Sequence, residues 1–133
     1  MAGLLGTLLA ACGVNRGPDD ATVTAALQQA VEGSEHYVVG SIRYLSSFSR
    51  GTAIDGALTL RAADHDELLT AYDDVLQRLS AAYRELSPKD PAQVAVIARA
   101  EADRGLSAAA EDVVPPASAG HPDTDDLAAH YGT

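Results

Sequence analysis

The feature that most constrains the fold of this chain is an amphipathic segment from His65 to Leu86. Its apolar side chains recur every three or four residues, so a helix gathers them along one face. They are Leu68, Leu69, Tyr72, Val75, Leu76, Leu79, Tyr83 and Leu86. Asp64, with Glu67 three residues later, predicts the N-terminal cap, and Ser87-Pro88 predicts the end. A helix of this length must bury its apolar stripe against another layer of structure.

The sequence on both sides of this helix predicts strands. The stretch from Tyr37 to Phe48 is rich in β-branched and aromatic residues, and Ser49-Arg50-Gly51 supplies a turn after it. Residues 54–61 then alternate between apolar and mostly polar side chains, which is typical of a strand covered on one face and open to water on the other. A third strand is predicted from Gln93 to Arg104. The stretch from Leu106 to Val114 fits either a fourth strand or a helix.

Two further segments predict helices. Ala21 to Glu32 places apolar residues on one side and is followed by Gly33, and Asp123 to Tyr131 fits one or two turns. The order α-β-β-α-β predicts an α+β two-layer sandwich, with a mainly antiparallel sheet of three or four strands and two helices on one face. We expect this domain to span residues 21–114. A tether, residues 13–20, precedes it, and an irregular acidic tail with the short helix, residues 115–133, follows.

The N-terminal residues carry a localisation signal. An uncharged apolar run leads into Leu9-Ala10-Ala11-Cys12 and Gly13, and it is far shorter than the ~20 residues that span a bilayer. This segment resembles the lipobox of bacterial lipoproteins, in which the cysteine is acylated and becomes the first residue of the mature protein. The resemblance implies a lipoprotein-signal-like segment at residues 1–12, lipidation of Cys12, and anchoring on the extracytoplasmic side of the cell membrane. The alternative is a cytoplasmic protein with an apolar N-terminus and an incidental buried cysteine.

Charge and cysteine content exclude several classes of function. Lys and Arg total 9 against 19 Asp and Glu, a net charge of −10, which repels nucleic acid and anionic headgroups. We therefore expect no nucleic-acid partner, and a membrane contact made through the lipid anchor and not through a basic patch. The single cysteine excludes an intrachain disulfide. The abundance of Ala and the preference for Arg over Lys resemble actinobacterial proteins.

Three features of the domain are similar to the BON domain of bacterial envelope proteins. They are the element order, Val31-Glu32-Gly33 after the first helix, and Gly56-Ala57-Leu58-Thr59-Leu60 on the second strand. The resemblance covers residues 20–103 and implies binding of lipid or envelope components and structural support, without catalysis. Arg61-Ala62-Ala63 replaces the glycine that commonly follows the second strand in that family.

The titratable and nucleophilic residues predict no catalytic residue and no metal site. His121 and His130 flank three aspartates, but no pair of histidines has the i,i+4 spacing that brings two ligands to one helix face. No serine lies in a Gly-x-Ser-x-Gly or Ser-x-x-Lys sequence, and no phosphate-binding glycine pattern occurs. We therefore expect that the chain is not an enzyme and uses no cofactor.

Charged residues of the predicted strands form one part of a candidate interaction surface. Four arginines are placed to share the exposed sheet face: Arg43, Arg50, Arg61 and Arg99. They either bind an anion or pair with the carboxylates Asp55, Glu101 and Asp103, and the second arrangement is favoured.

Apolar residues of the first strand form the other part. Tyr37 and Leu45 point to the opposite side of the strand from Ile42 and Tyr44, so one of these two sets faces outward. A hairpin that is apolar on both faces either docks a second chain or a ligand, or is covered by the tail after Val113.

Together these patterns predict a small acidic envelope lipoprotein that acts as a non-catalytic binding or structural module. Its expected partners are the membrane, through the lipid anchor, and an envelope protein or lipid. A homo-oligomer is compatible with the same surface. The alternative is a soluble cytoplasmic homo-oligomer of α+β fold that associates through its sheet edge or its open face.

Overall fold

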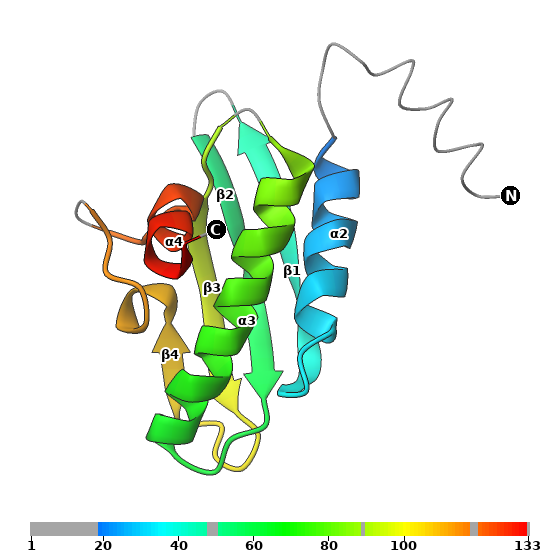
Figure 1. Cartoon of the computed structure of the whole chain (residues 1–133). Helices are drawn as coiled ribbons and strands as arrows, with labels where there is room; N and C mark the ends of the chain where they lie inside the picture. Colours follow the sequence, from blue (N-terminus) through cyan, green and yellow to red (C-terminus); the bar gives the residue numbers. More distant parts are fainter. Residues whose placement is uncertain (1–18, 48–50, 89, 118–119, 133) are drawn as a thin grey trace, which may run out of the picture.

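The computed structural model describes residues 19–47, 51–88, 90–117 and 120–132 (Figure 1). Cys12 and most of the predicted tether lie outside the described residues, as does Arg50. The elements are helix α2 (Asp20–Glu32), strands β1 (Tyr37–Ser47) and β2 (Gly51–Leu60), helix α3 (His65–Leu86), strands β3 (Gln93–Ala100) and β4 (Ser107–Ala109), the 3-10 helix η1 (Ala110–Asp112) and helix α4 (Thr124–Tyr131). The predicted α+β class and the order α-β-β-α-β are confirmed.

The four strands form one mixed sheet in the order β1-β2-β3-β4. The hairpin β1–β2 is antiparallel, as is the pair β3–β4, whereas β2 and β3 are parallel. The parallel pair follows from α3, which carries the chain across one face of the sheet and returns it to the end from which β2 began. The sheet is therefore mainly antiparallel, as predicted.

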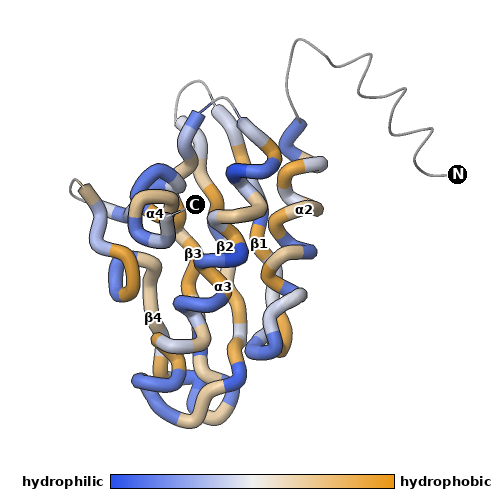
Figure 2. Tube along the Cα trace, in the orientation of Figure 1, coloured by the Kyte–Doolittle hydropathy of each residue, from blue (hydrophilic) through white to orange (hydrophobic). Residues whose placement is uncertain are grey.

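The helices lie on one face of this sheet (Figure 1). Helix α2 packs against β1 and α3, and α4 packs against α3. Figure 2 shows apolar and hydrophilic residues alternating along the strands and helices, which gives each element one side for the core. The largest fully buried side chains include Leu27, Ile54, Leu58, Leu60, Leu68, Tyr72, Leu76, Leu79 and Leu127.

The predicted bounds of α3 are confirmed, and local hydrogen bonds explain both ends. Asp64 Oδ1 accepts from the Glu67 N–H at 2.8 Å, and Glu67 Oε1 accepts from the Ala63 N–H at 2.8 Å. At the other end, Ser87 adopts the left-handed backbone conformation with φ 51°. This conformation ends the helix before Pro88.

The end of the sheet differs from the prediction. Strand β3 stops at Ala100 and not at Arg104, because Asp103 begins a turn. Its carboxylate accepts from the Gly105 N–H at 2.9 Å, and its carbonyl accepts from the Leu106 N–H at 3.0 Å. Residues 106–114, which fitted either strand or helix, contain a short strand that pairs with β3 and then one turn of 3-10 helix.

The C-terminal tail packs on the helical side of the sheet. The Val94 N–H of β3 donates to the Pro122 carbonyl at 2.8 Å. Leu127 of α4 is fully buried, and the Tyr131 hydroxyl donates to the Asp73 carboxylate of α3 at 2.7 Å. The tail therefore does not cover the outward side of the β1–β2 hairpin, which was one of the two expectations for it.

Candidate functional site

The face of the sheet turned away from the helices carries no covering element within the part of the chain that the structure describes. We call it the open face. Its side chains come from alternating strand positions, in register with one another. They are Val39, Ser41, Arg43 and Leu45 from β1, Ala53, Asp55, Ala57 and Thr59 from β2, Gln93, Ala95, Ile97 and Arg99 from β3, and Ser107 and Ala109 from β4.

The open face carries apolar side chains on every strand, interspersed with polar ones. Val39 and Leu45 are the large apolar side chains most exposed among the described residues, at 57% and 42%. They share the face with the half-buried Ile97 and with alanines on three strands. Single exposed apolar residues are common on protein surfaces, but exposed apolar side chains that recur across one uncovered sheet face are typical of an interaction surface.

Three charged side chains stand on this face. Arg43 Nε lies 2.9 Å from Asp55 Oδ1 across the β1–β2 pair. Both side chains are exposed, so this ion pair adds little to the free energy of unfolding. The Arg99 side chain has no hydrogen bond or ion pair with the described residues. The open face therefore carries a small positive charge in a chain whose net charge is −10.

The structure separates the residues predicted for an interaction surface. It brings Arg43, Leu45 and Arg99 together on the open face. Arg61 follows β2, and its guanidinium donates to the Glu35 carbonyl at 3.2 Å, beyond the paired strands. Arg61 therefore belongs to the end of the sheet and not to the open face.

Tyr37 lies on the other side of β1 from Leu45. A bulge between Tyr37 and Val39 shifts the register, so Tyr37 packs against the core. Its hydroxyl donates to the Gly40 carbonyl at 2.7 Å. The expectation that Tyr37 and Leu45 share a side assumed a regular strand, and the bulge corrects it.

Helix α2 closes the edge of the sheet beside the open face. Three polar side chains spaced four residues apart on α2 bond to the outward backbone groups of β1: Asp20, Thr24 and Gln28. Thr24 Oγ1 accepts from the Tyr44 N–H, and Gln28 Oε1 accepts from the Ile42 N–H, both at 2.9 Å. We call this set of bonds the α2 ladder.

The α2 ladder follows from matched repeat lengths. Four residues of helix advance about 6 Å and two residues of strand about 6.7 Å, so one helix face meets alternate strand residues. Asp20 Oδ2 accepts from the Ser46 N–H, and Gln28 Nε2 donates to the Gly40 carbonyl, both at 3.1 Å. A further strand would need these same groups, so β1 is a protected edge. The other edge, β4, has only three residues.

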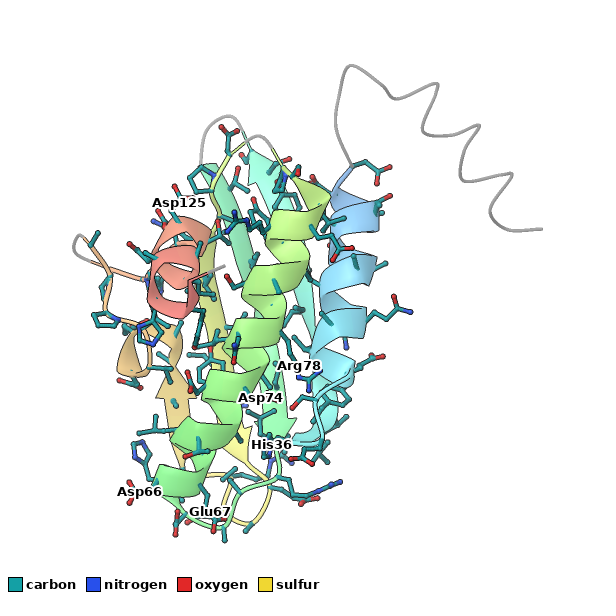
Figure 3. The ribbon with its side chains drawn as sticks, in the orientation of Figure 1. His36, Asp66, Glu67, Asp74, Arg78 and Asp125 are labelled. Atoms are coloured by element: carbon teal, nitrogen blue, oxygen red, sulfur yellow. The ribbon has the colours of Figure 1, made fainter. Side chains whose placement is uncertain are left out.

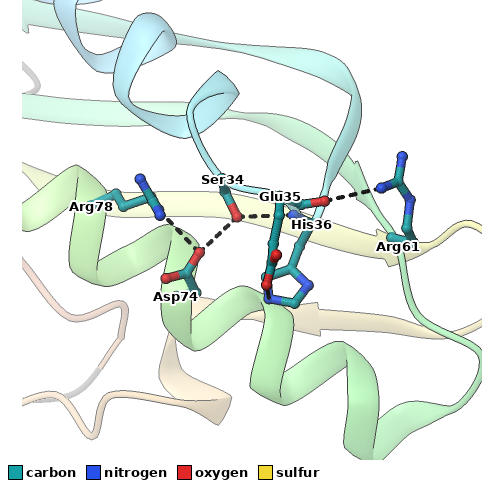
Figure 4. A network of polar contacts seen from close by, with 6 residues as sticks. All are labelled: Ser34, Glu35, His36, Arg61, Asp74 and Arg78. Atoms are coloured by element: carbon teal, nitrogen blue, oxygen red, sulfur yellow. Dashed lines mark hydrogen bonds and ion pairs between the residues drawn. The ribbon is translucent and has the colours of Figure 1, made fainter.

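A polar network joins the loop after α2 to the middle of α3 (Figures 3 and 4). The Ser34 hydroxyl donates to Asp74 Oδ2 at 2.7 Å, and Arg78 Nε donates to the same oxygen at 3.1 Å. The His36 backbone N–H donates to Ser34 Oγ at 3.1 Å. Partial burial opposes ionisation of Asp74, but the bonds from Ser34 and Arg78 outweigh it and hold the pKa of Asp74 below its ordinary range.

This network has the residue types of a nucleophilic site without the geometry of one. The Ser34 side chain is buried and donates its hydrogen bond to Asp74, whose lowered pKa makes it a weak base. The His36 ring faces Glu35, with Nε2 3.8 Å from Oε1 (Figure 4). The arrangement fits a clamp that fixes the α2–β1 loop on α3.

Asp74→Asn is expected to lower the free energy of unfolding by about 1–2 kcal/mol near neutral pH, because Ser34 and Arg78 lose a charged acceptor. The folded-state pKa of Asp74 is below its unfolded value of about 4. The advantage of the wild type is therefore complete above about pH 4 and is lost as the pH falls through the folded pKa. Urea unfolding at a series of pH values measures it. A difference that grows toward acid pH would contradict this account.

A polar hollow of about 410 Å³ lies between the end of α3 and the start of α4. Its polar groups bind neighbouring backbone. The Tyr83 hydroxyl donates to the Asp90 carbonyl, and Thr124 Oγ1 accepts from the Ala92 N–H at 3.0 Å. Burial raises the pKa of Tyr83, so this hydroxyl stays neutral. The hydrogen-bonded side chains that line the hollow therefore hold α4 against the domain.

The histidines of the tail contact other groups than the neighbouring aspartates. His121 Nδ1 lies 2.9 Å from Glu111 Oε1, and His130 stacks edge-on against Tyr131. Over the described ranges, no group of three or more His, Cys, Asp or Glu side chains is arranged to hold a metal ion. None of the described helices combines the length and apolarity needed to cross a membrane.

No family model matches this chain, and no curated protein matches it. The element order that carried the resemblance to the BON domain is present in the structure. The fold and the site together define the class: an α+β two-layer domain with helices on one face of its sheet and an open face of mixed apolar and polar side chains that the described residues leave uncovered.

Proposed function

We propose that this chain is a small, lipid-anchored, non-catalytic binding module of the bacterial cell envelope that holds a protein partner on its open face. The observation that carries the proposal is the open face itself. It exposes Val39, Leu45 and Ala57 to solvent, although the core is already complete on the other side of the sheet. An exposed apolar face of this kind costs solubility unless a partner covers it.

The lipid anchor of the proposal rests on Leu9-Ala10-Ala11-Cys12. Acyl transfer to the Cys12 sulfur would hold the chain at the membrane without a basic surface, which the net charge of −10 does not supply. The residues between Cys12 and α2 span at most about 25 Å when extended, so the domain would stay close to the bilayer.

Site-specific photo-crosslinking in cells of the native host tests the proposal. A photoreactive amino acid replaces Ala57, at the centre of the open face, or Ala81, exposed on the outer side of α3 as a matched control. The proposal predicts a discrete protein adduct in the membrane fraction from position 57 and none from position 81. No adduct from either position, or the same adducts from both, would overturn the binding role of the open face.

A further inference from the structure

We infer that the partner on the open face is a second copy of this chain, in a twofold dimer that packs the two sheets face to face. The inference rests on the proposed function and names its partner. The edges of the sheet do not offer this contact. The α2 ladder occupies the outward groups of β1, and β4 has three residues. The open face is the extended surface of the sheet that the described residues leave uncovered.

Charge favours a copy of this chain at that face. Two chains of net charge −10 repel one another over most of their surfaces. The open face is the exception, because Arg43 and Arg99 outnumber Asp55 there. Two copies that approach through their open faces keep their acidic surfaces farthest apart, so the overall repulsion between them is least in this orientation.

In a twofold dimer the same surface of each copy faces itself, so that surface must carry both partners of every contact between the copies. The open face does so in charge, because it carries both the Arg99 guanidinium and the Asp55 carboxylate. The open face is also self-complementary in shape. Leu45 and Ile97 project, whereas Ala53 and Ala57 leave room at neighbouring positions. Two sheets that pack at about 10 Å interdigitate side chains of these sizes.

The position of the anchor suits this dimer. Helix α2 begins beside the end of β1, where Asp20 bonds to Ser46. A lipid held a few residues before α2 would attach at one end of the strands (Figure 1). Two anchored copies would meet in the plane of the membrane, at a raised local concentration.

Sedimentation equilibrium of the full chain carrying Cys12→Ser, which removes acylation and intermolecular disulfides, tests the inference. We expect a monomer–dimer equilibrium in the micromolar range. Ala57→Arg adds bulk and like charge at the centre of both faces and is expected to weaken the dimer by at least about 100-fold. Ala81→Arg adds the same side chain on α3 and is expected to leave the dimer intact. Circular dichroism confirms that both variants fold.

Salt gives a second readout. Because each copy has a net charge of −10, raising the ionic strength from about 0.05 to 0.5 M is expected to strengthen the dimer. A wild type that stays monomeric at all accessible concentrations, or equal dimers from Ala57→Arg and Ala81→Arg, would overturn the inference. The mass of the cross-linked adduct from position 57 separates the two claims. An adduct with a different protein would contradict the second copy and leave the proposed function standing, whereas the absence of any adduct would contradict both.

Discussion

Replacing Gly56 by alanine is expected to lower the free energy of unfolding by about 3–5 kcal/mol, a large fraction of the stability of an ordinary domain. Gly56 lies in β2 with φ +138°, a conformation that side chains rarely adopt. An added Cβ would stand 2.3 Å from the Ser41 carbonyl oxygen and 2.8 Å from Ile42 Cα. Both atoms belong to the backbone of β1, so the hairpin would have to open to admit the methyl group. Urea unfolding followed by circular dichroism measures the loss.

Gly51→Ala provides the matched control for Gly56→Ala. Gly51 also has a positive φ, +80°, but apart from its chain neighbours no atom of the described residues lies within 4 Å of its added Cβ. It should therefore lose only the conformational preference of glycine, about 1 kcal/mol. The difference between the two variants isolates the backbone clash. Equal losses would contradict the assigned strand spacing at Gly56.

Removing the α2 ladder is expected to have the second largest effect. In the double variant Thr24→Val, Gln28→Leu, the N–H groups of Ile42 and Tyr44 lose their side-chain partners, and the Gly40 carbonyl keeps only the bond from the Tyr37 hydroxyl. We expect the free energy of unfolding to fall by about 2–3 kcal/mol, since each lost bond costs about 1 kcal/mol. The freed edge of β1 should also pair with other chains, which light scattering would detect as concentration-dependent aggregation.

The control for the ladder variant makes the same two kinds of substitution at other positions of α2. Thr22→Val with Gln29→Leu places identical side chains on exposed positions of α2, away from β1. It is expected to remain within about 0.5 kcal/mol of the wild type and free of aggregation. If both double variants behaved alike, the ladder would be incidental to the stability of the edge.

Local patterns in the sequence are sufficient to predict most of the helices and strands. Helix α3 was predicted to the residue because its stripe, its cap at Asp64 and its stop at Ser87 all agree. The alternation in β2 predicted one covered and one open sheet face, and the residues Arg43, Leu45 and Arg99 lie on the open one. These predictions needed only the period of a strand and the period of a helix.

Features that depend on tertiary contacts were not predictable in the same way. The bulge between Tyr37 and Val39 turns Tyr37 toward the core, and no local residue pattern predicts it. The bond between Ser34 and Asp74 joins residues 40 positions apart. The α2 ladder did leave a signal, since hydrogen-bonding side chains recur every four residues at positions 20, 24 and 28. The sequence does not show that a strand lies beside this helix, so these polar side chains alone predict a solvated helix face.

The central claim, a lipid-anchored module, is tested most directly by intact mass spectrometry of the chain from membrane and soluble fractions of its native host, beside a Cys12→Ser variant. The account predicts a membrane-bound species that begins at Cys12 and carries added acyl mass, and it predicts that this species is lost in the variant. An unmodified soluble chain that still carries Met1 or Ala2 would contradict it.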